Sequence, residues 1–514
     1  MSFKSLENIP HLDMLEPFKG VFCDEYAVKE LKTCHEREMS DNKIVGSLEE
    51  AIRLCGLKDG MTISFHHHFR NGDFVVNQVM NTIAGMGIKN LTLAASSLID
   101  IHKPLIEHIK NGVVRRIETS GLRGELAEAI SHGLMDVPVV FRSHGGRAAA
   151  IETGLVKIDV AFLGAPSCDP FGNANGYSRD NDKGVICGSM GYAKSDAQYA
   201  EKVIILTDNI VPFPNVPFGI PESDVDYIVE TETIGDPNGI MSGATRFTKN
   251  PKELLIASLA SEVIQATGLF RNGFSIQMGS GGASLATVRF LREKMLKEKI
   301  KASFALGGIT GQMVALHEEG LIKKILDVQS FDLEAANSLK NNRFHQQISA
   351  SYYASPNNDG SAVNQLDFVV LSALEVDVDF NVNVLTGSDG VIRGAIGGHS
   401  DTAAGASVSI ITCPLTRGRL ATIVDRVNTI VTPGKTIDIV VTDQGVAVNP
   451  LREDLRLALV SSGIEVCSIE HLRDKARKLC GESAPIRYTD KVVGISTYRD
   501  NSVIDLIYQV EEDV

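Results

Sequence analysis

The chain contains the stretch Asp159-Val-Ala-Phe-Leu-Gly-Ala-Pro-Ser-Cys-Asp-Pro-Phe-Gly-Asn-Ala-Asn175 and repeats its pattern 208 residues later as Asp367-Phe-Val-Val-Leu-Ser-Ala-Leu-Glu-Val-Asp-Val-Asp-Phe-Asn-Val-Asn383. In each copy an apolar run opens into a polar segment that closes with Asn-x-Asn. A continuous apolar run is typical of a buried strand in a parallel sheet, and open α/β sheets bind ligands at the carboxyl ends of such strands. The repeat therefore predicts an α/β fold in which each copy supplies a core strand and part of a binding rim.

The similarity between the two halves extends upstream of this stretch, in the same order. The paired segments are 60–65 with 273–278, 88–89 with 300–301, and 111–117 with 319–325. Solenoid repeats have periods of only about 20 to 50 residues, so a period above 200 predicts two domains of one fold. We predict an N-terminal arm over residues 1–45, a first domain over 46–235 and a second over 236–514, both α/β with mainly parallel sheets. Prolines and acidic residues mark the boundary between 212 and 239.

Composition excludes several classes of function. The chain has 514 residues, 43% of them apolar, and a net charge of −14. That charge argues against binding to nucleic acid or to an anionic membrane, because both need basic surface. The eight cysteines form no C-x-x-C pair and have no histidine at metal-ligand spacing, so we expect reduced thiols and no metal site. With no signal-peptide pattern and no long apolar run, we expect a soluble cytoplasmic protein.

Glycine-rich loops suggest a site built from backbone amides. Gly279, Ser280, Gly281 and Gly282 separate a predicted strand, 274–278, from a predicted helix, 283–297. Such a junction points free N–H groups and the positive end of a helix at an anion. A turn that only needs positive φ explains the glycines equally well.

Two further loops fall where the repeat places them near the same sheet edge. One contains Gly307 and Gly308, and the other runs through Gly387, Ser388, Asp389 and Gly390 to Arg393. The chain has neither the Walker nor the Rossmann glycine pattern, which disfavours transfer of nucleotide phosphate and of hydride.

These segments are similar to a known family. The glycine loops at 279–282 and 387–390, the segments 372–377 and 381–383, and Val440-Val-Thr-Asp-Gln-Gly-Val-Ala447 resemble the coenzyme A transferase superfamily, with its NagB/RpiA-like domains. Nearly the whole chain resembles the alpha subunits of citrate lyase, the citrate CoA-transferase component. The segments that carry this second resemblance are Pro10-His-Leu-Asp13, Cys34-His-Glu-Arg-Glu38, Ser64-Phe-His-His-His-Phe69 and Pro214-Asn-Val-Pro-Phe-Gly-Ile-Pro221.

The resemblance implies an enzyme that exchanges acetyl for citryl on an acyl-carrier-protein or coenzyme A thioester and releases acetate. It implies citrate, an acyl carrier protein subunit and a citryl-thioester lyase subunit as partners, a homo-oligomer, and no permanently bound cofactor. Two alternatives stay open: a CoA-transferase for another acid such as citramalate, and a non-catalytic regulatory subunit that binds a sugar phosphate or nucleotide.

One departure from the family bears on mechanism. Related transferases with a covalent mechanism carry a glutamate where this chain has Gly307, and glycine cannot form an acyl-enzyme. We therefore expect direct attack of a citrate carboxylate on the acetyl thioester, through a mixed anhydride. The expected oxyanion donors are the amides of the three glycine loops. Glu375 replaces Ser167 of the first copy; it is a candidate nucleophile, although a structural glutamate is the better explanation.

For citrate binding we expect His66, His67 and His68 together with Arg70, although a plain hydrogen-bonding role suits the histidines equally well. Proteins commonly bind a carboxylate through two parallel hydrogen bonds from an arginine guanidinium. The candidate arginines lie near turns at positions 70, 123, 142, 147 and 393. Finally, the basic run 292–301 is best explained as a solvated helix face; its alternative role is docking of an acidic carrier protein.

Overall fold

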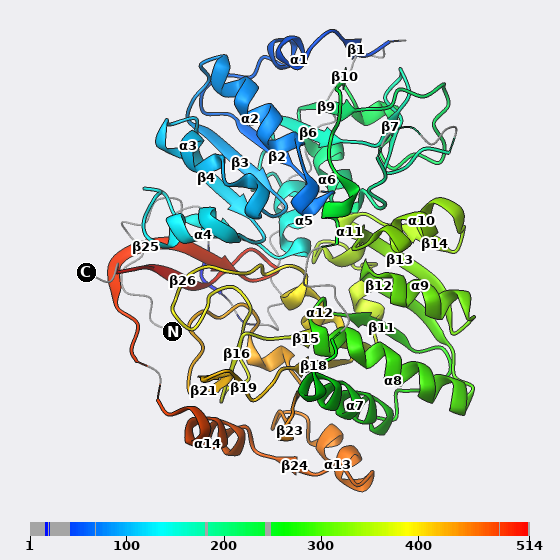
Figure 1. The fold of residues 1–514 in the computed structure, drawn as a ribbon, viewed down its shortest axis with the longest axis vertical. Coiled ribbons are helices and arrows are strands. Elements are labelled where there is room, and N and C mark those ends of the chain that lie inside the picture. Colours follow the sequence, from blue (N-terminus) through cyan, green and yellow to red (C-terminus); the bar gives the residue numbers. More distant parts are fainter. Residues whose placement is uncertain are drawn as a thin grey trace.

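The computed structural model describes residues 16–18, 20, 42–66, 68–179, 183, 185–241, 248–482 and 484–511. Most of the predicted arm, including the segments 10–13 and 34–38, lies outside these ranges, and so does His67. The described chain is a mixed α/β structure with mainly parallel sheets, as the repeat predicts. Two large sheets are stacked along the long axis of the molecule (Figure 1).

The first sheet has ten strands and consists mostly of the N-terminal half. In sheet order its strands are β1 (Ile44–Val45), β10 (Tyr227–Glu230), β9 (Lys202–Thr207), β6 (Val160–Gly164), β2 (Thr62–Phe65), β3 (Leu91–Ala95), β4 (Val114–Thr119), β5 (Val139–Phe141), β25 (Tyr488–Thr497) and β26 (Val503–Val510). All neighbours are parallel except the closing hairpin β25–β26.

The second sheet has nine strands. In order they are β14 (His345–Gln347), β13 (Ile322–Ser330), β12 (Ala302–Ile309), β11 (Ser275–Met278), β15 (Phe368–Ser372), β18 (Val408–Thr412), β22 (Ile439–Thr442), β23 (Gly445–Val448) and β24 (Val466–Cys467). The predicted core strands of the repeat are thus β6 and β15, and each pairs in parallel with strands on both sides.

Seven strands follow one another in the same order in both sheets. The order β10-β9-β6-β2-β3-β4-β5 in the first sheet matches β22-β18-β15-β11-β12-β13-β14 in the second. The matching strands are also equivalent along the chain, and β2 and β11 lie at the centre of each set. Because all these strands are parallel, the carboxyl ends of each set lie at a single edge.

Helices cover the faces of both sheets. On the first sheet they are α1 (Leu48–Leu54), α2 (Val75–Gly85), α3 (Leu105–Lys110), α4 (Gly124–Ser131), α5 (His144–Glu152) and α6 (Gly191–Tyr199); along the second half they are α7 (Pro251–Ala266), α8 (Gly282–Glu298), α9 (Gly311–Glu318), α10 (Leu333–Asn341), α11 (Ala350–Ala354), α12 (His399–Gly405), α13 (Glu453–Ser461) and α14 (Ile469–Cys480). Helix α7 begins with the Asn250 side chain accepting from the amide of Lys252 and with Pro251 at the first position.

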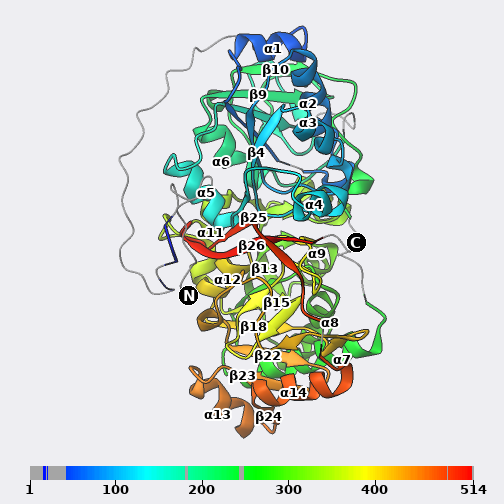
Figure 2. The same ribbon diagram turned by 90° about the vertical axis from the view of Figure 1, so that its left-hand side faces the viewer.

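The C-terminal strands return to the first sheet. Strand β25 pairs with β5, more than 340 residues earlier in the chain, and β26 pairs with β25. Figure 2 shows this red hairpin crossing the middle of the molecule, between β4 above and β15 below. The tail thus closes the first sheet, and the predicted domain limits stay predictions.

The polar ends of the two repeat copies form equivalent buried turns. Asp169 Oδ1 accepts from the amides of Phe171, Gly172 and Asn173, at 3.0 to 3.1 Å. In the second copy Asp377 Oδ1 accepts from the amides of Asp379 and Asn381, at 3.0 and 2.9 Å. A carboxylate that bonds the amides just after it fixes a turn locally. The repeated polar residues therefore hold the chain as it leaves β6 and β15.

Candidate functional site

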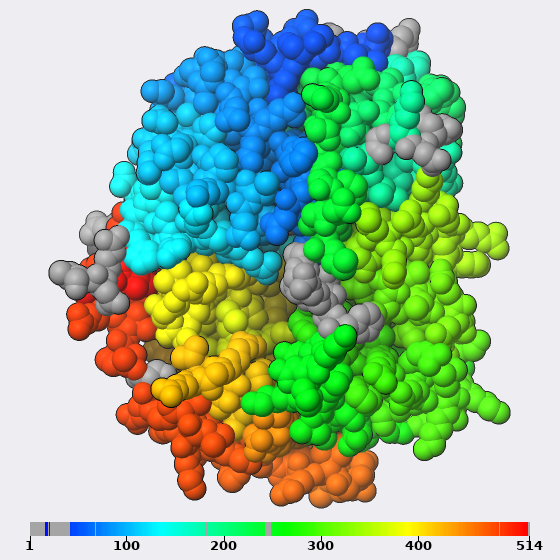
Figure 3. Space-filling view, viewed as in Figure 1, coloured from blue at the N-terminus to red at the C-terminus, as the bar shows by residue number. Residues whose placement is uncertain are grey.

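A cavity of about 600 Å³ lies between the carboxyl ends of the two parallel sheets. In Figure 3 the N-terminal half, from blue to green, rests on the C-terminal half along the boundary that contains this cavity. The walls combine residues at or after the carboxyl ends of strands with residues of the neighbouring helices. The N-terminal half contributes Arg70, Ser97, Ser120, Arg123, His144 and Tyr192, and the C-terminal half contributes Glu253, Gln277, Gly279 to Gly282, Gly308, Gln329, Phe331, Tyr353, Ser372 and His399, among others. The position agrees with the rule that predicts ligands at the carboxyl edge.

Three arginines line this cavity: Arg417, which donates to the carbonyls of Ala373 and Leu374, and the two arginines of the N-terminal half, Arg70 and Arg123. Arg70 is 8% exposed, its guanidinium lies 4.9 Å from the centre of the Phe331 ring, and its Nη1 has no hydrogen-bond partner among the described residues. Burial, and then the nearby charge of Arg123, lowers the pKa of Arg70 to about 10. Burial also lowers the pKa of Arg123. Two desolvated cations that remain protonated at neutral pH have the chemistry that pairs with carboxylates.

Arg70 is also held in an unusual backbone conformation. Its φ is 54°, in the left-handed region that a residue with a Cβ rarely adopts. Such strain costs on the order of 1–3 kcal/mol and persists only where the surrounding structure imposes it. The guanidinium is therefore placed by the fold, over a ring from the opposite half of the molecule.

The other three candidate arginines are already paired. Arg142 donates to Glu118 and to Asn501, at 2.9 and 2.7 Å. Arg147 makes a forked pair with Asp196, at 2.6 and 2.8 Å. Arg393 forms an ion pair with Asp389 on the same loop. None of the three is part of the described cavity wall.

The histidines after β2 lie behind the cavity wall. Nδ1 of His66 is 2.5 Å from Ser96 Oγ, and burial lowers the pKa of His68 to about 3. Their rings are 4.1 Å apart, the His66 ring is 5.2 Å from Tyr192, and the Tyr192 ring is 4.3 Å from His144. This column of rings reaches the cavity only at its far end, where Tyr192 and His144 form the wall. The structure thus places His66 and His68 as supports for the two wall residues, and His67 lies outside the described residues.

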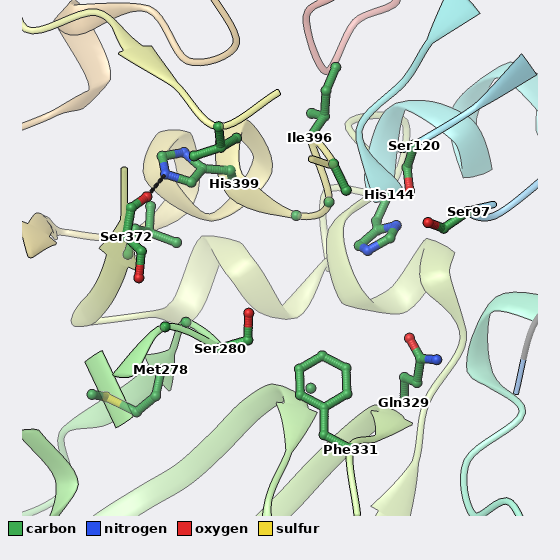
Figure 4. Close-up of a pocket in the computed structure, with 18 of the residues that line it drawn as sticks. Ser97, Ser120, His144, Met278, Ser280, Gln329, Phe331, Ser372, Ile396 and His399 are labelled. Atoms are coloured by element: carbon green, nitrogen blue, oxygen red, sulfur yellow. Dashed lines mark hydrogen bonds between the residues drawn. The ribbon is translucent and has the colours of Figure 1, made fainter. Parts of the chain in front are cut away.

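The loop 279–282 brings the start of α8 to the cavity. Gly281 is the N-cap and no side chain caps the helix, so the first amides of α8 face the cavity without an intrahelical partner. Gly279 differs, because its N–H donates to Val370 O at 2.7 Å. Ser280 also lines the cavity, as Figure 4 shows. These amides and the helix dipole can stabilise an oxyanion.

This loop requires glycines because atoms of neighbouring segments lie very close to its Cα atoms. Gly279, Gly281 and Gly282 are not among the glycines with positive φ, which removes the alternative of a turn that needs it. A Cβ at Gly281 would lie 1.9 Å from Ser372 Oγ, and one at Gly282 would lie 2.5 Å from Glu253 Oε2. Glycine therefore lets the loop pack against the end of β15.

Gly307 and Gly308 have different surroundings. Gly307 has a φ of +100°, and a Cβ there would lie 2.7 Å from the side-chain amide carbon of Gln277. Gln277 is itself fixed, since its Nε2 donates to the Tyr353 hydroxyl at 2.9 Å. Only Gly308 lines the cavity, with the Phe331 ring against its Cα. The backbone and Gln277 together leave no room for an acidic side chain at position 307.

Glu375 and the loop 387–390 lie outside the cavity wall. Glu375 is 6% exposed and accepts from Asn383 Nδ2 and from the amide and side chain of Asn428, at 2.9 to 3.2 Å. Burial raises its pKa. In the loop, Gly390 donates to Gly387 O and Gly387 donates to Val391 O, so both amides are engaged within the turn. These contacts agree with a structural role for Glu375.

Several cavity residues were not singled out from the sequence. They are Tyr192, Gln277, Gln329, Phe331, Tyr353, His144, His399 and Glu253. Gln277 precedes the glycine loop by two positions, which is the only sequence signal among them. Glu253 is the one carboxylate in the described wall. Within the same described ranges, no group of three or more His, Cys, Asp or Glu could hold a metal ion.

The fold and the site define an α/β protein with two mainly parallel sheets and one cavity between their carboxyl ends. The 4-hydroxybutyrate CoA-transferase of Porphyromonas gingivalis superposes with a TM-score of 0.51 at 18% identity, covering 84% of this chain and 97% of that one, which shows a shared fold.

Sequence comparison narrows the class to one family. The model of the family "Citrate lyase, alpha subunit" matches residues 41–510. The citrate lyase alpha chain of Haemophilus influenzae is 59% identical over 476 residues, 93% of this chain and 94% of that one. A crystal structure described as the alpha subunit of citrate lyase from Streptococcus mutans, in complex with citrate, is similar with a TM-score of 0.92 and 54% identity, covering 99% of this chain and 100% of that one. The chain belongs to the citrate lyase alpha subunit family.

Proposed function

We propose that this protein exchanges acetyl for citryl on a coenzyme A-type thioester, carried by an acyl carrier protein or by coenzyme A itself, and releases acetate. One observation carries the proposal: two desolvated arginines, placed to bind citrate carboxylates, face an uncapped helix N-terminus across a single cavity. The relatives named citrate lyase alpha chain, and the similar structure with citrate bound, support citrate as the acid.

In the proposed mechanism a citrate carboxylate oxygen attacks the carbonyl carbon of the acetyl thioester. The tetrahedral oxyanion is stabilised by amides at the start of α8, and the thiolate leaves, giving an acetyl-citryl anhydride. The thiolate then attacks the citryl carbonyl carbon, and acetate leaves with the electron pair of the anhydride bond. A carboxylate is ionised at neutral pH, so neither step needs a general base. The cavity must hold the anhydride away from water.

The absence of space at Gly307 supports direct transfer, and Glu253 is the natural rival nucleophile. If Glu253 formed an acyl-enzyme, Glu253→Gln would abolish exchange and the wild type would show ping-pong kinetics. Direct transfer instead predicts that Glu253→Gln retains exchange within about 10-fold, and that borohydride traps no protein-bound thioester. Abolished exchange in a folded Glu253→Gln protein would contradict direct transfer.

The test of function is an exchange assay with the full chain. Labelled acetyl thioester and citrate are incubated with the protein, and formation of citryl thioester and free acetate is measured. We expect both products in equal amounts. Replacing citrate by citramalate distinguishes the alternative acid, and binding without exchange would indicate a regulatory subunit.

We further propose two tandem coenzyme A transferase-like domains, supported by the shared strand order of the sheets. We propose an acyl carrier subunit and a lyase subunit as partners, in a homo-oligomeric cytoplasmic complex. The six described cysteines are free, which suits a reducing compartment. No described helix is long and apolar enough to cross a membrane.

The basic run 292–301 stays a candidate for carrier docking. It begins in the C-terminal half of α8, about 15 Å of helix from the end that meets the cavity. Arg292 pairs with Glu319 and Lys294 donates to Gln265, so part of the run is engaged. Docking predicts that neutralising Lys294, Lys297 and Lys299 weakens carrier binding at low salt and has little effect at high salt.

A further inference from the structure

Two histidines line the cavity, and their hydrogen bonding differs completely. Nδ1 of His399 is 2.7 Å from Thr432 Oγ1, and its Nε2 is 3.0 Å from Ser372 O. His144 makes no such bond within the described chain, and its Nδ1 is buried without a partner. The nitrogen that can meet a ligand is Nε2, which is not among the buried atoms, forms no hydrogen bond with a described residue and lies 3.7 Å from the position a Cβ would take at Gly397 on the cavity wall. A polar atom at a ligand cavity that has no protein partner can take its partner from the ligand.

The ring of His144 is held in place although neither ring nitrogen bonds to a described residue. His144 is the first residue of α5, and its amide donates to Gly397 O at 2.9 Å. Asp401, from the opposite half, accepts from Ser143 Oγ and from the Gly145 amide, both at 2.8 Å. The ring packs against Tyr192 at 4.3 Å. Figure 4 shows His144 beside Ser97 and Ser120, across the cavity from Ser280.

His144 is also electrically neutral. Burial, and then the charge of Arg147, lowers its pKa to about 3. A neutral imidazole has one N–H donor and one acceptor nitrogen, and it offers no charge to a carboxylate. An aliphatic hydroxyl likewise donates one hydrogen bond and accepts others. The cavity thus separates two tasks, with Arg70 and Arg123 suited to carboxylates and His144 suited to a hydroxyl group.

We propose that His144 binds the tertiary hydroxyl of citrate and so makes the site selective for hydroxy-tricarboxylates. The inference rests on the proposed function, because it takes citrate as the acid bound here. Propane-1,2,3-tricarboxylate keeps all three carboxylates and lacks only this hydroxyl. A site that hydrogen-bonds a substrate hydroxyl rejects the analogue without it, because a buried polar group is then left unpaired.

The test compares the two acids by equilibrium binding to the full chain, with transfer from acetyl-CoA as a second readout. We expect the wild type to bind citrate about 100-fold more tightly than propane-1,2,3-tricarboxylate. In His144→Phe we expect this preference to fall below about 10-fold, through loss on citrate alone. His144→Asn, which keeps a neutral donor and acceptor, should retain part of the preference. His471→Phe, a matched change at an exposed histidine, should retain all of it.

The outcomes separate the two proposals. Equal binding of both acids by the wild type overturns the role of His144, and so does an unchanged preference in His144→Phe. Equal weakening of both acids in His144→Phe also overturns it, because that pattern indicates a structural role. Failure of the proposed function is a different result: the wild type prefers citrate in binding, yet transfers acetyl to neither acid.

Discussion

The segments that follow β2 and β11 occupy equivalent places in the two sheets and differ in what they present to the cavity. After β2 the chain continues through a run of histidines, of which His66 and His68 are buried, to Arg70, a strained residue with a desolvated side chain. After β11 it continues through Gly279 to Gly282, which contribute backbone and a helix N-terminus. Both segments line one cavity from opposite sides.

The difference shows how one pattern, used twice, can divide a reaction between its copies. Burying a guanidinium is costly unless an anion pairs with it, so the first segment favours a state in which a carboxylate is bound. Backbone amides are neutral, and they can be aimed at a developing oxyanion without carrying a charge into the site. The first segment is thus suited to holding the acid and the second to stabilising the transition state.

The largest effect on activity should come from removing the buried guanidinium of Arg70. In Arg70→Met we expect kcat/KM for citrate to fall about 1,000-fold, about 4 kcal/mol, because a buried charged partner is lost. Arg70→Lys should recover little, since lysine cannot form the forked pair. Steady-state transfer from acetyl-CoA measures both. The control is Arg393→Met, at the exposed pair with Asp389, where we expect a change below about 3-fold. A similar loss in both variants would refute the assignment of citrate binding to Arg70.

The variant Gly281→Ala tests whether the backbone amides of the loop 279–282 stabilise the oxyanion. The added Cβ would lie 1.9 Å from Ser372 Oγ, so the loop must shift and its amides move with it. We expect kcat to fall about 100-fold, as for loss of one oxyanion donor, with a smaller change in KM. The control is Gly85→Ala, where nothing lies within 4 Å of the added Cβ. An unchanged kcat in Gly281→Ala would show that these amides do not act on the transition state.

The sequence predicts the elements well because their signals are local. The apolar runs after Asp159 and Asp367 are β6 and β15, and Asn250 and Pro251 mark the start of α7. The pairing of β25 with β5 has no local signal, because it depends on packing between segments more than 340 residues apart. The sequence of the C-terminal tail therefore does not predict that it joins the first sheet.

The site is predicted only in part, for the same physical reason. Five arginines near turns are equivalent in sequence, and what separates them is whether a distant carboxylate such as Asp196 or Glu118 pairs with them. Arg70 and Arg123 reach the cavity without such a partner within hydrogen-bonding distance in the described chain. His144 carries no motif at all, since its importance arises from its place at the start of α5, against Tyr192 and on the cavity wall.

The smallest effect should come from Glu375, where the two copies of the repeat differ. Asn428 Nδ2 donates to Glu375 Oε1 at 3.2 Å, and in the first copy Asn215 Nδ2 donates to Ser167 Oγ at the same distance. Glu375 and Ser167 thus have equivalent structural roles, each accepting a hydrogen bond from an asparagine side chain. We expect Glu375→Gln to change kcat/KM less than about 3-fold and to lower stability by about 1–3 kcal/mol, because Gln offers one acceptor oxygen to three donors. Activity assays and denaturant unfolding measure these effects.

The pH dependence of that stability difference gives a second check. Burial raises the pKa of Glu375 in the folded protein, so its contribution to stability is fully present below the pKa of the unfolded carboxyl and is lost as the pH rises through the raised value. The difference in unfolding free energy between wild type and Glu375→Gln should therefore shrink as the pH rises above the ordinary glutamate pKa of about 4.3. A difference that grows with pH, or a complete loss of transfer in a folded variant, would instead assign Glu375 to the chemistry and end the equivalence with Ser167.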